Sequence, residues 1–138
     1  MDTDGTGDLL MSAARMLRRR FVTTLARWDI TPAQGRALRI VCASDEPPRL
    51  SELADRLRIV PRSATEVVDA LEARGLVVRR PDPADRRATC VLATAEGERL
   101  AVQIEEARAH EADGFLAVLP AADRAELGRI LERLVAQD

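Results

Sequence analysis

Arginine gives this chain its most distinctive chemistry. All 21 of its Lys and Arg residues are arginines. The absence of lysine is typical of a base-composition bias, so the placement of the arginines is more informative than their number. Residues 49–90 hold nine arginines and seven acidic residues, whereas residues 91–138 hold five arginines and ten acidic residues. Because a guanidinium group matches the geometry of phosphate, the central segment is the part that would bind a polyanion.

Other reactive side chains are too isolated to predict catalysis or a metal site. The one histidine, His110, lies in a charged stretch with no Cys or Ser placed to work with it. Carboxylates at 105–106 and 111–113 have no His or Cys partner that would complete a zinc site, so they indicate a solvated acidic face. No glycine-rich phosphate loop is present. We therefore expect no enzymatic activity, no metal and no cofactor.

The elements that position the central arginines are predicted from cap and turn residues. Thr31-Pro32-Ala33-Gln34 predicts a helix start, with Thr31 as N-cap. A short helix is expected over 52–57 with Ser51 as its N-cap. Pro61 opens another helix, which Arg74-Gly75 ends. Two helices this close together are typical of a helix-turn-helix.

A hairpin is predicted to follow, with strands over 76–80 and 87–93. Between them Pro81-Asp82-Pro83-Ala84-Asp85 is too rich in proline and aspartate for regular structure, so the tip is expected to be exposed. Two helices followed by a hairpin with arginines at its tip make a winged helix-turn-helix. DNA is therefore the first partner to consider.

The predicted DNA contacts lie on the helix that Pro61 opens and on the hairpin. At about 100° per residue, Arg62, Glu66 and Asp69 face outward from that helix, and Ser63 and Thr65 in its first turn can donate to bases or phosphates. The predicted contact set is Arg49, Arg62, Ser63, Thr65, Glu66, Arg79, Arg86 and Arg87.

Longer helices are predicted on both sides of this module, over 8–27, 95–118 and 121–136, with Thr94 capping the second. The winged helix-turn-helix module is complete without these three helices. Their apolar faces must therefore be covered by some other surface. Self-association about a two-fold axis would cover them; packing on the module within one chain is the alternative. The expected dimer contacts are Leu10, Leu17, Leu127, Ile130, Leu131 and Leu134.

The predicted fold class is therefore mainly α with a small β-hairpin wing: a winged helix-turn-helix with flanking dimerisation helices. One compact subunit is expected at this length, with an N-terminal dimerisation helix (1–30), a DNA-binding lobe (31–93) and C-terminal dimerisation helices (94–138). No signal peptide is recognisable and no stretch approaches about 18 apolar residues. We expect a cytoplasmic protein without a membrane partner.

Residues 50–97 resemble the multiple antibiotic resistance regulator (MarR) family of bacterial transcription factors. The motifs that carry the resemblance are LSELADRL, PRSATEVVDALEARGLVVRR, the wing DPADRRA, and Thr94 with Gly97. The resemblance implies a homodimer in which the helix opened by Pro61 enters the major groove and the wing lies along the minor groove. It also implies that Asp85 holds Arg87 in position. It also implies a repressor of a pseudo-palindromic operator that a small molecule releases.

Two positions depart from the family pattern. Val60 stands where a capping Ser or Thr is common, and Glu66 where a basic or neutral polar residue is common. Glu66 can pair with Arg62 one turn earlier, which we favour, or accept from cytosine N4. The acidic residues on this helix also leave open a second class of function, a protein-interaction module or anti-repressor that does not bind DNA.

The family resemblance also implies a crevice for an aromatic or phenolic effector, between the dimer helices and the DNA-binding lobe. The arginines expected to meet a carboxylate there are Arg15 and Arg39. Trp28 is the expected stacking wall.

Overall fold

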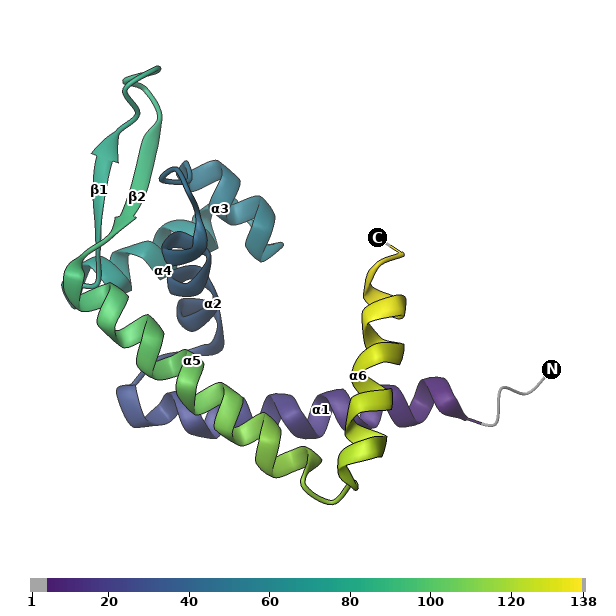
Figure 1. Ribbon diagram of the computed structural model, residues 1–138. Coiled ribbons are helices and arrows are strands. Elements are labelled where there is room, and N and C mark those ends of the chain that lie inside the picture. Colours follow the sequence, from purple (N-terminus) through teal and green to yellow (C-terminus); the bar gives the residue numbers. More distant parts are fainter. Residues whose placement is uncertain (1–4, 138) are drawn as a thin grey trace.

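Six α-helices and one two-stranded hairpin make up residues 5–137, the part of the chain that the computed structural model describes (Figure 1). The helices are α1 (Thr6–Leu25), α2 (Pro32–Ala43), α3 (Leu50–Leu57), α4 (Pro61–Ala73), α5 (Ala95–Leu116) and α6 (Ala121–Val135), and a 3-10 turn, Ala26–Trp28, follows α1. The strands are β1 (Val77–Pro81) and β2 (Thr89–Ala93). The predicted fold class is confirmed.

The predicted caps of α2 and α5 are confirmed. The Thr31 hydroxyl accepts from the Gln34 N–H at 3.2 Å, and the Gln34 side chain accepts from the Thr31 N–H at 3.2 Å. The Thr94 hydroxyl accepts from the Gly97 N–H and donates to the carbonyl of Gly75 at 2.6 Å. Thr94 therefore fixes the start of α5 and also ties it to the end of the α4 segment.

The prediction that Ser51 caps α3 is wrong, because the helix begins at Leu50, two residues earlier than predicted. The Val91 N–H donates to the Pro48 carbonyl, and Arg49 forms a β-bridge with Cys90. These contacts hold Arg49 in an extended conformation, so it becomes the N-cap position, with its N–H donating to the Glu52 carboxylate. Ser51 is an exposed residue inside the helix.

The hairpin is antiparallel, with register from Val77 opposite Ala93 to Pro81 opposite Thr89. The second strand starts at Thr89, two residues later than predicted. The Ala88 N–H donates to the Asp85 carbonyl at 2.9 Å, so Asp85 to Ala88 form a turn. Arg86 and Arg87 consequently occupy the turn at the tip, where their side chains are exposed.

The hydrophobic core lies between α2, α3, α4, the hairpin and the N-terminal half of α5. Its largest fully buried side chains are Leu38, Leu53, Leu57, Val68, Leu71, Val77 and Val91. Helix α5 begins directly against the residue before β1: a Cβ atom at Gly97 would lie 2.0 Å from the Leu76 carbonyl oxygen. Only glycine permits this approach, so the hairpin and α5 are in backbone contact.

Helices α1, α5 and α6 extend away from this core (Figure 1). Arg20 joins α1 to α5, with its guanidinium 3.7 Å from the Glu111 carboxylate and 5.5 Å from the centre of the Phe115 ring. Helix α6 follows α5 after a turn over residues 117–120 and has no buried residue. None of the helices in residues 5–137 is both long and apolar enough to span a membrane.

Candidate nucleic-acid interface

The outer face of α4 presents the side chains that the helical wheel placed there. Arg62 and Glu66 are exposed, and Ser63 and Thr65 are half-buried. Within residues 5–137 no ion pair joins Arg62 to Glu66, so the pairing that we favoured is absent. The Thr65 hydroxyl donates to the Pro61 carbonyl at 3.1 Å. Arg62 and Glu66 are consequently both unpaired and directed to solvent, while Thr65 is partly used within the helix.

Arg79 does not present a free guanidinium group. It lies 2.6 Å from the Asp69 carboxylate and 2.7 Å from that of Glu72, both on α4, and its side chain is only 24% exposed. Desolvation opposes its charge, but hydrogen bonds to Asp69 and Glu72 outweigh that cost and raise the pKa of Arg79. Arg79 therefore neutralises two acidic groups on the outer side of α4 and fixes the wing to that helix.

This arrangement gives a first prediction. Arg79→Met should lower the free energy of unfolding by about 1 kcal/mol, as expected for partly exposed ion pairs. It should also weaken DNA binding, because Asp69 and Glu72 would then repel phosphate. Urea denaturation and fluorescence anisotropy on duplex DNA measure the two effects. Adding Asp69→Asn and Glu72→Gln should restore the affinity; if affinity stays low in the triple variant, wing position rather than repulsion is the cause.

Arg49 is likewise held by an acidic partner. Its Nε donates to the Asp82 carboxylate at 2.5 Å, and Asp82 also accepts from the Ala84 N–H at 2.9 Å. The Ala84 N–H and then Arg49 lower the pKa of Asp82. Because Arg49 belongs to the start of α3 and Asp82 to the wing, this pair braces the wing against the helix-turn-helix. Arg49 can reach phosphate only with the remainder of its guanidinium group.

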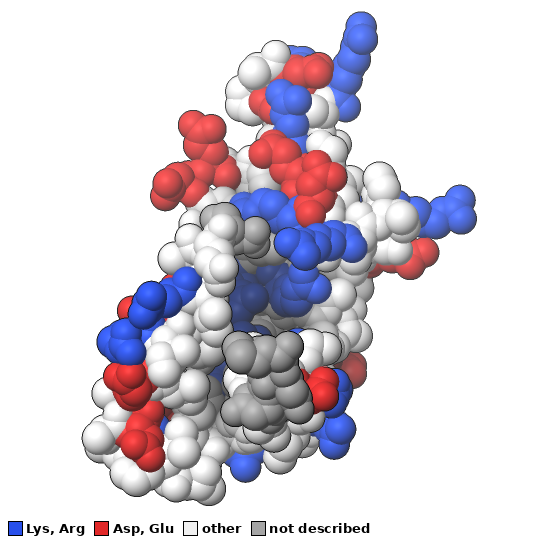
Figure 2. Space-filling view, turned by 90° about the vertical axis from the view of Figure 1, so that its right-hand side faces the viewer, with Lys and Arg blue, Asp and Glu red and all other residues white. Residues whose placement is uncertain are grey.

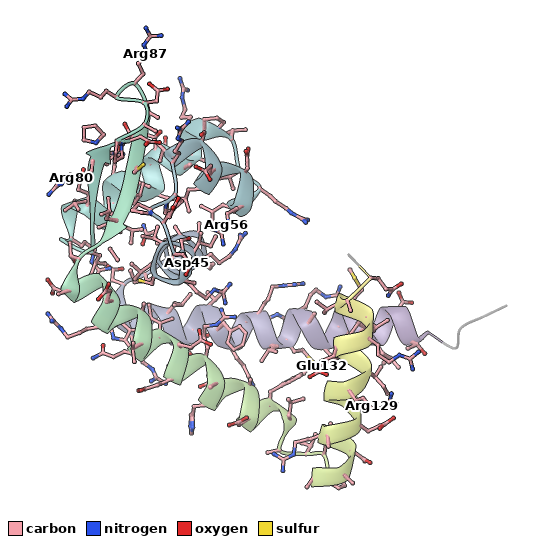
Figure 3. The ribbon with its side chains drawn as sticks, turned by 45° about the horizontal axis from the view of Figure 1, so that its top comes forward. Asp45, Arg56, Arg80, Arg87, Arg129 and Glu132 are labelled. Carbon is pink, nitrogen blue, oxygen red and sulfur yellow. The ribbon has the colours of Figure 1, made fainter. Side chains whose placement is uncertain are left out.

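The wing tip offers two arginines with exposed side chains. Arg86 and Arg87 are exposed, and Figure 3 shows Arg87 projecting from the tip, away from the helices. Asp85 contacts Arg87 through the backbone, since its carboxylate accepts from the Arg87 N–H at 3.0 Å. The aspartate therefore shapes the turn that presents both arginines.

Arg80 is a basic residue of the wing that sequence reasoning missed. It is exposed and points outward from β1 in Figure 3, and its guanidinium donates to the Arg79 carbonyl at 2.9 Å. Side chains alternate along a strand, so Arg79 shares a face with the buried Val77 and Arg80 lies on the other. That alternation is the signal that could have separated the two arginines.

A cavity of about 240 Å³ lies between α1, α2 and α5. Of the two arginines predicted for an effector crevice, Arg39 lines this cavity, whereas Arg15 lies in an adjoining depression on α1. Trp28 packs against the core and is not among the lining residues. Sequence reasoning missed the other arginines of the cavity, Arg18, Arg36 and Arg108; Arg36 and Arg39, three residues apart on one helix face, were the available signal.

The leucines expected in the dimer contact are incompletely covered within one chain. Leu17, Leu127 and Leu131 are half-buried. Leu10, Ile130 and Leu134 are 47%, 42% and 46% exposed. Helices α1 and α6 therefore carry apolar surface that no other element of residues 5–137 buries.

The sequence matches known regulators over its winged-helix segment and beyond. Residues 28–88 match a family model described as MarR family. A protein of Thauera aromatica described as a transcriptional regulatory protein for the hcr operon is 33% identical over 121 residues, which span 87% of this chain and 72% of that protein.

The chain belongs to the MarR family. The transcriptional regulator HosA of Escherichia coli O111:H- is 36% identical over 95 residues, covering 64% of this chain and 68% of HosA. Among solved structures, apo MarR from E. coli superposes with a TM-score of 0.86 at 26% identity, covering 94% of this chain and 95% of MarR. This MarR family protein is therefore a transcriptional regulator with a winged helix-turn-helix DNA-binding lobe.

Proposed function

We propose that this MarR family regulator is a homodimeric repressor, without enzymatic activity of its own, that binds a pseudo-palindromic operator. Helix α4 reads bases in the major groove and the wing lies along the minor groove. The observation that carries the proposal is the exposure of Arg62 on α4 together with Arg86 and Arg87 at the wing tip. Phosphate contacts of this kind set register, while base contacts specify sequence.

Dimerisation is assigned to the helices within 1–30 and 94–138, and DNA binding to 31–93. The support is the apolar surface on α1 and α6, which an isologous contact would cover. A two-fold axis would also present two copies of α4 and of the wing to the two halves of the operator. Half-sites of a pseudo-palindrome then lie one or more helical turns apart, at about 34–36 Å per turn.

A small anionic molecule is the proposed signal that releases the operator. The cavity between α1, α2 and α5 supports this because apolar side chains and Arg39 both line it. CouR from Rhodococcus jostii RHA1, solved with p-coumaroyl-CoA, is 26% identical to this chain with a TM-score of 0.77, covering 96% of this chain and 92% of CouR. A ligand at this position would lie between the dimerisation helices and the DNA-binding lobe.

The test separates base reading from phosphate binding. On an operator selected from random duplexes, Arg62→Ala should cost about 1–3 kcal/mol, with little effect on scrambled DNA. Arg87→Ala should weaken binding to all duplexes alike and reduce the salt slope by about one unit. Fluorescence anisotropy at several salt concentrations measures both variants.

The alternative, a winged-helix module that binds protein or acts as an anti-repressor, predicts a different result. Glu66, exposed and unpaired on α4, is the observation in its favour. If the wild-type chain shows no salt-dependent affinity for any duplex, and Arg62→Ala and Arg87→Ala change nothing, the repressor proposal fails and this alternative replaces it.

A further inference from the structure

Helix α4 carries more negative than positive charge, although it is the helix assigned to the major groove above. Its charged side chains are one arginine, Arg62, and three carboxylates, Glu66, Asp69 and Glu72. On the face drawn in Figure 2, acidic and basic side chains are interspersed toward the wing, at the top of the view. That face is not uniformly basic. The carboxylates of α4 therefore need partners of their own in a complex with DNA.

Two of the three carboxylates are already neutralised by the wing. Arg79 of β1 lies 2.6 Å from the Asp69 carboxylate and 2.7 Å from that of Glu72. Glu66 is exposed, and its carboxylate forms no hydrogen bond or ion pair with another residue in the described range 5–137. Glu66 is therefore the carboxylate of α4 that remains free to bind a group outside the chain.

Arg62 lies one helical turn before Glu66, and no ion pair joins these two described side chains. An i, i+4 pair is weaker when the basic residue is nearer the N-terminus, as it is here. Both residues are exposed, and Arg62 is the second residue of α4. N-terminal residues of a recognition helix reach base edges. Four residues span about 6 Å of helix, which corresponds to about two base-pair steps of about 3.4 Å.

An ionised carboxylate only accepts hydrogen bonds, and this restricts what it can bind in the major groove. Guanine presents two acceptors there, and thymine presents an acceptor and a methyl group, so neither base offers a donor. Adenine presents its N6 amino group beside the N7 acceptor, which repels a carboxylate. Cytosine presents its N4 amino group with no acceptor on the same base. Cytosine is therefore the base that an unpaired carboxylate on α4 selects.

We propose that Glu66 is a specificity-determining residue, which selects one cytosine in each half of the operator by accepting a hydrogen bond from its N4 amino group. The proposal rests on the base-reading role of α4 in the function proposed above, and it specifies one base of the operator. At that position Glu66 also excludes guanine and thymine, because their acceptors would face an acceptor. Arg62, about two base-pair steps away, binds guanine through O6 and N7.

The first experiment selects duplexes from a random library with the full wild-type chain, with Glu66→Ala and with Glu66→Gln, and sequences the bound DNA. Wild type should enrich cytosine at one position of each half-site. Glu66→Ala should lose that preference and keep the others. Glu66→Gln should enrich adenine there, because glutamine donates to N7 and accepts from N6. Identical enrichment at every position in wild type and both variants would overturn the proposal.

Affinity measurements then separate base reading from charge repulsion. Fluorescence anisotropy compares the selected operator with a duplex in which 2-pyrimidinone, which lacks the N4 amino group, replaces that cytosine in one half-site. The replacement should weaken wild-type binding about tenfold, as for one mismatched base pair, and should have little effect on Glu66→Ala. If Glu66 only repels phosphate, Glu66→Ala binds every duplex more tightly and both proteins respond alike to the replacement. That result would refute the assignment.

Glu106→Gln is the matched control, because it removes one carboxylate at an exposed position of α5, outside residues 31–93. It changes the net charge by the same amount as Glu66→Gln and should keep the cytosine preference of wild type. A chain that selects an operator which Glu66→Ala reads identically retains the proposed function and refutes the role of Glu66. A chain that selects no operator refutes both.

Discussion

Replacing Gly97 by alanine is expected to lower the free energy of unfolding by about 3 kcal/mol, the upper end of the usual cost of overpacking. The added Cβ would lie 2.0 Å from the Leu76 carbonyl oxygen and 3.0 Å from its carbon. Both are backbone atoms that no rotamer change can move, so α5 and the start of β1 must separate. Urea denaturation followed by circular dichroism measures the loss.

Gly128→Ala is the matched control for this substitution. Gly128 lies inside α6, where an added Cβ meets no atom within 4 Å. Alanine is favoured over glycine in a helix interior by about 1 kcal/mol, so this variant should be more stable than wild type. Equal stability of Gly97→Ala and wild type would contradict the close approach of α5 to Leu76.

Leu131→Asp is expected to abolish the dimer that we propose and with it nearly all operator affinity. Leu131 is half-buried on the face of α6 that also carries Leu127, Ile130 and Leu134. Burying each such side chain contributes roughly 1.5–3 kcal/mol, and a carboxylate in the contact adds a desolvation cost. Analytical ultracentrifugation should show monomers or aggregates, and anisotropy should show a loss of more than about 100-fold in operator affinity.

The control introduces the same residue on the other side of the same helix. Ala125 is exposed and lies roughly 160° around the helical wheel from Leu127. Ala125→Asp should therefore remain dimeric and bind operator normally. A Leu131→Asp dimer with wild-type affinity would show that α6 does not hold the protomers together.

The helix starts that could be predicted are those that depend on residues close together in the sequence. Thr31 and Thr94 cap through residues three positions away, so the starts of α2 and α5 are local properties. Ser51 was wrong because the start of α3 is set by the bridge from Arg49 to Cys90, which are 41 positions apart in the sequence. No local pattern carries that information.

In the candidate interface, too, some properties follow from local sequence and others only from tertiary structure. Arg62, Arg86 and Arg87 are exposed as predicted, because helix period and turn composition determine exposure. The ion pairs of Arg49 with Asp82 and of Arg79 with Asp69 depend instead on how the wing lies against α3 and α4. Arginine side chains are equally suited to phosphate and to carboxylate, so only tertiary structure could assign these partners.

Because Gly97 contacts the backbone of Leu76, a movement of α5 would be transmitted to the DNA-binding lobe. The helix has 22 residues and is therefore about 33 Å long. Its N-terminal end is attached to the hairpin by backbone contact and by the Thr94 hydrogen bonds. A tilt of about 5° at the far end would shift the lobe by about 3 Å. In the dimer that we propose, such a shift would change the spacing between the two copies of α4.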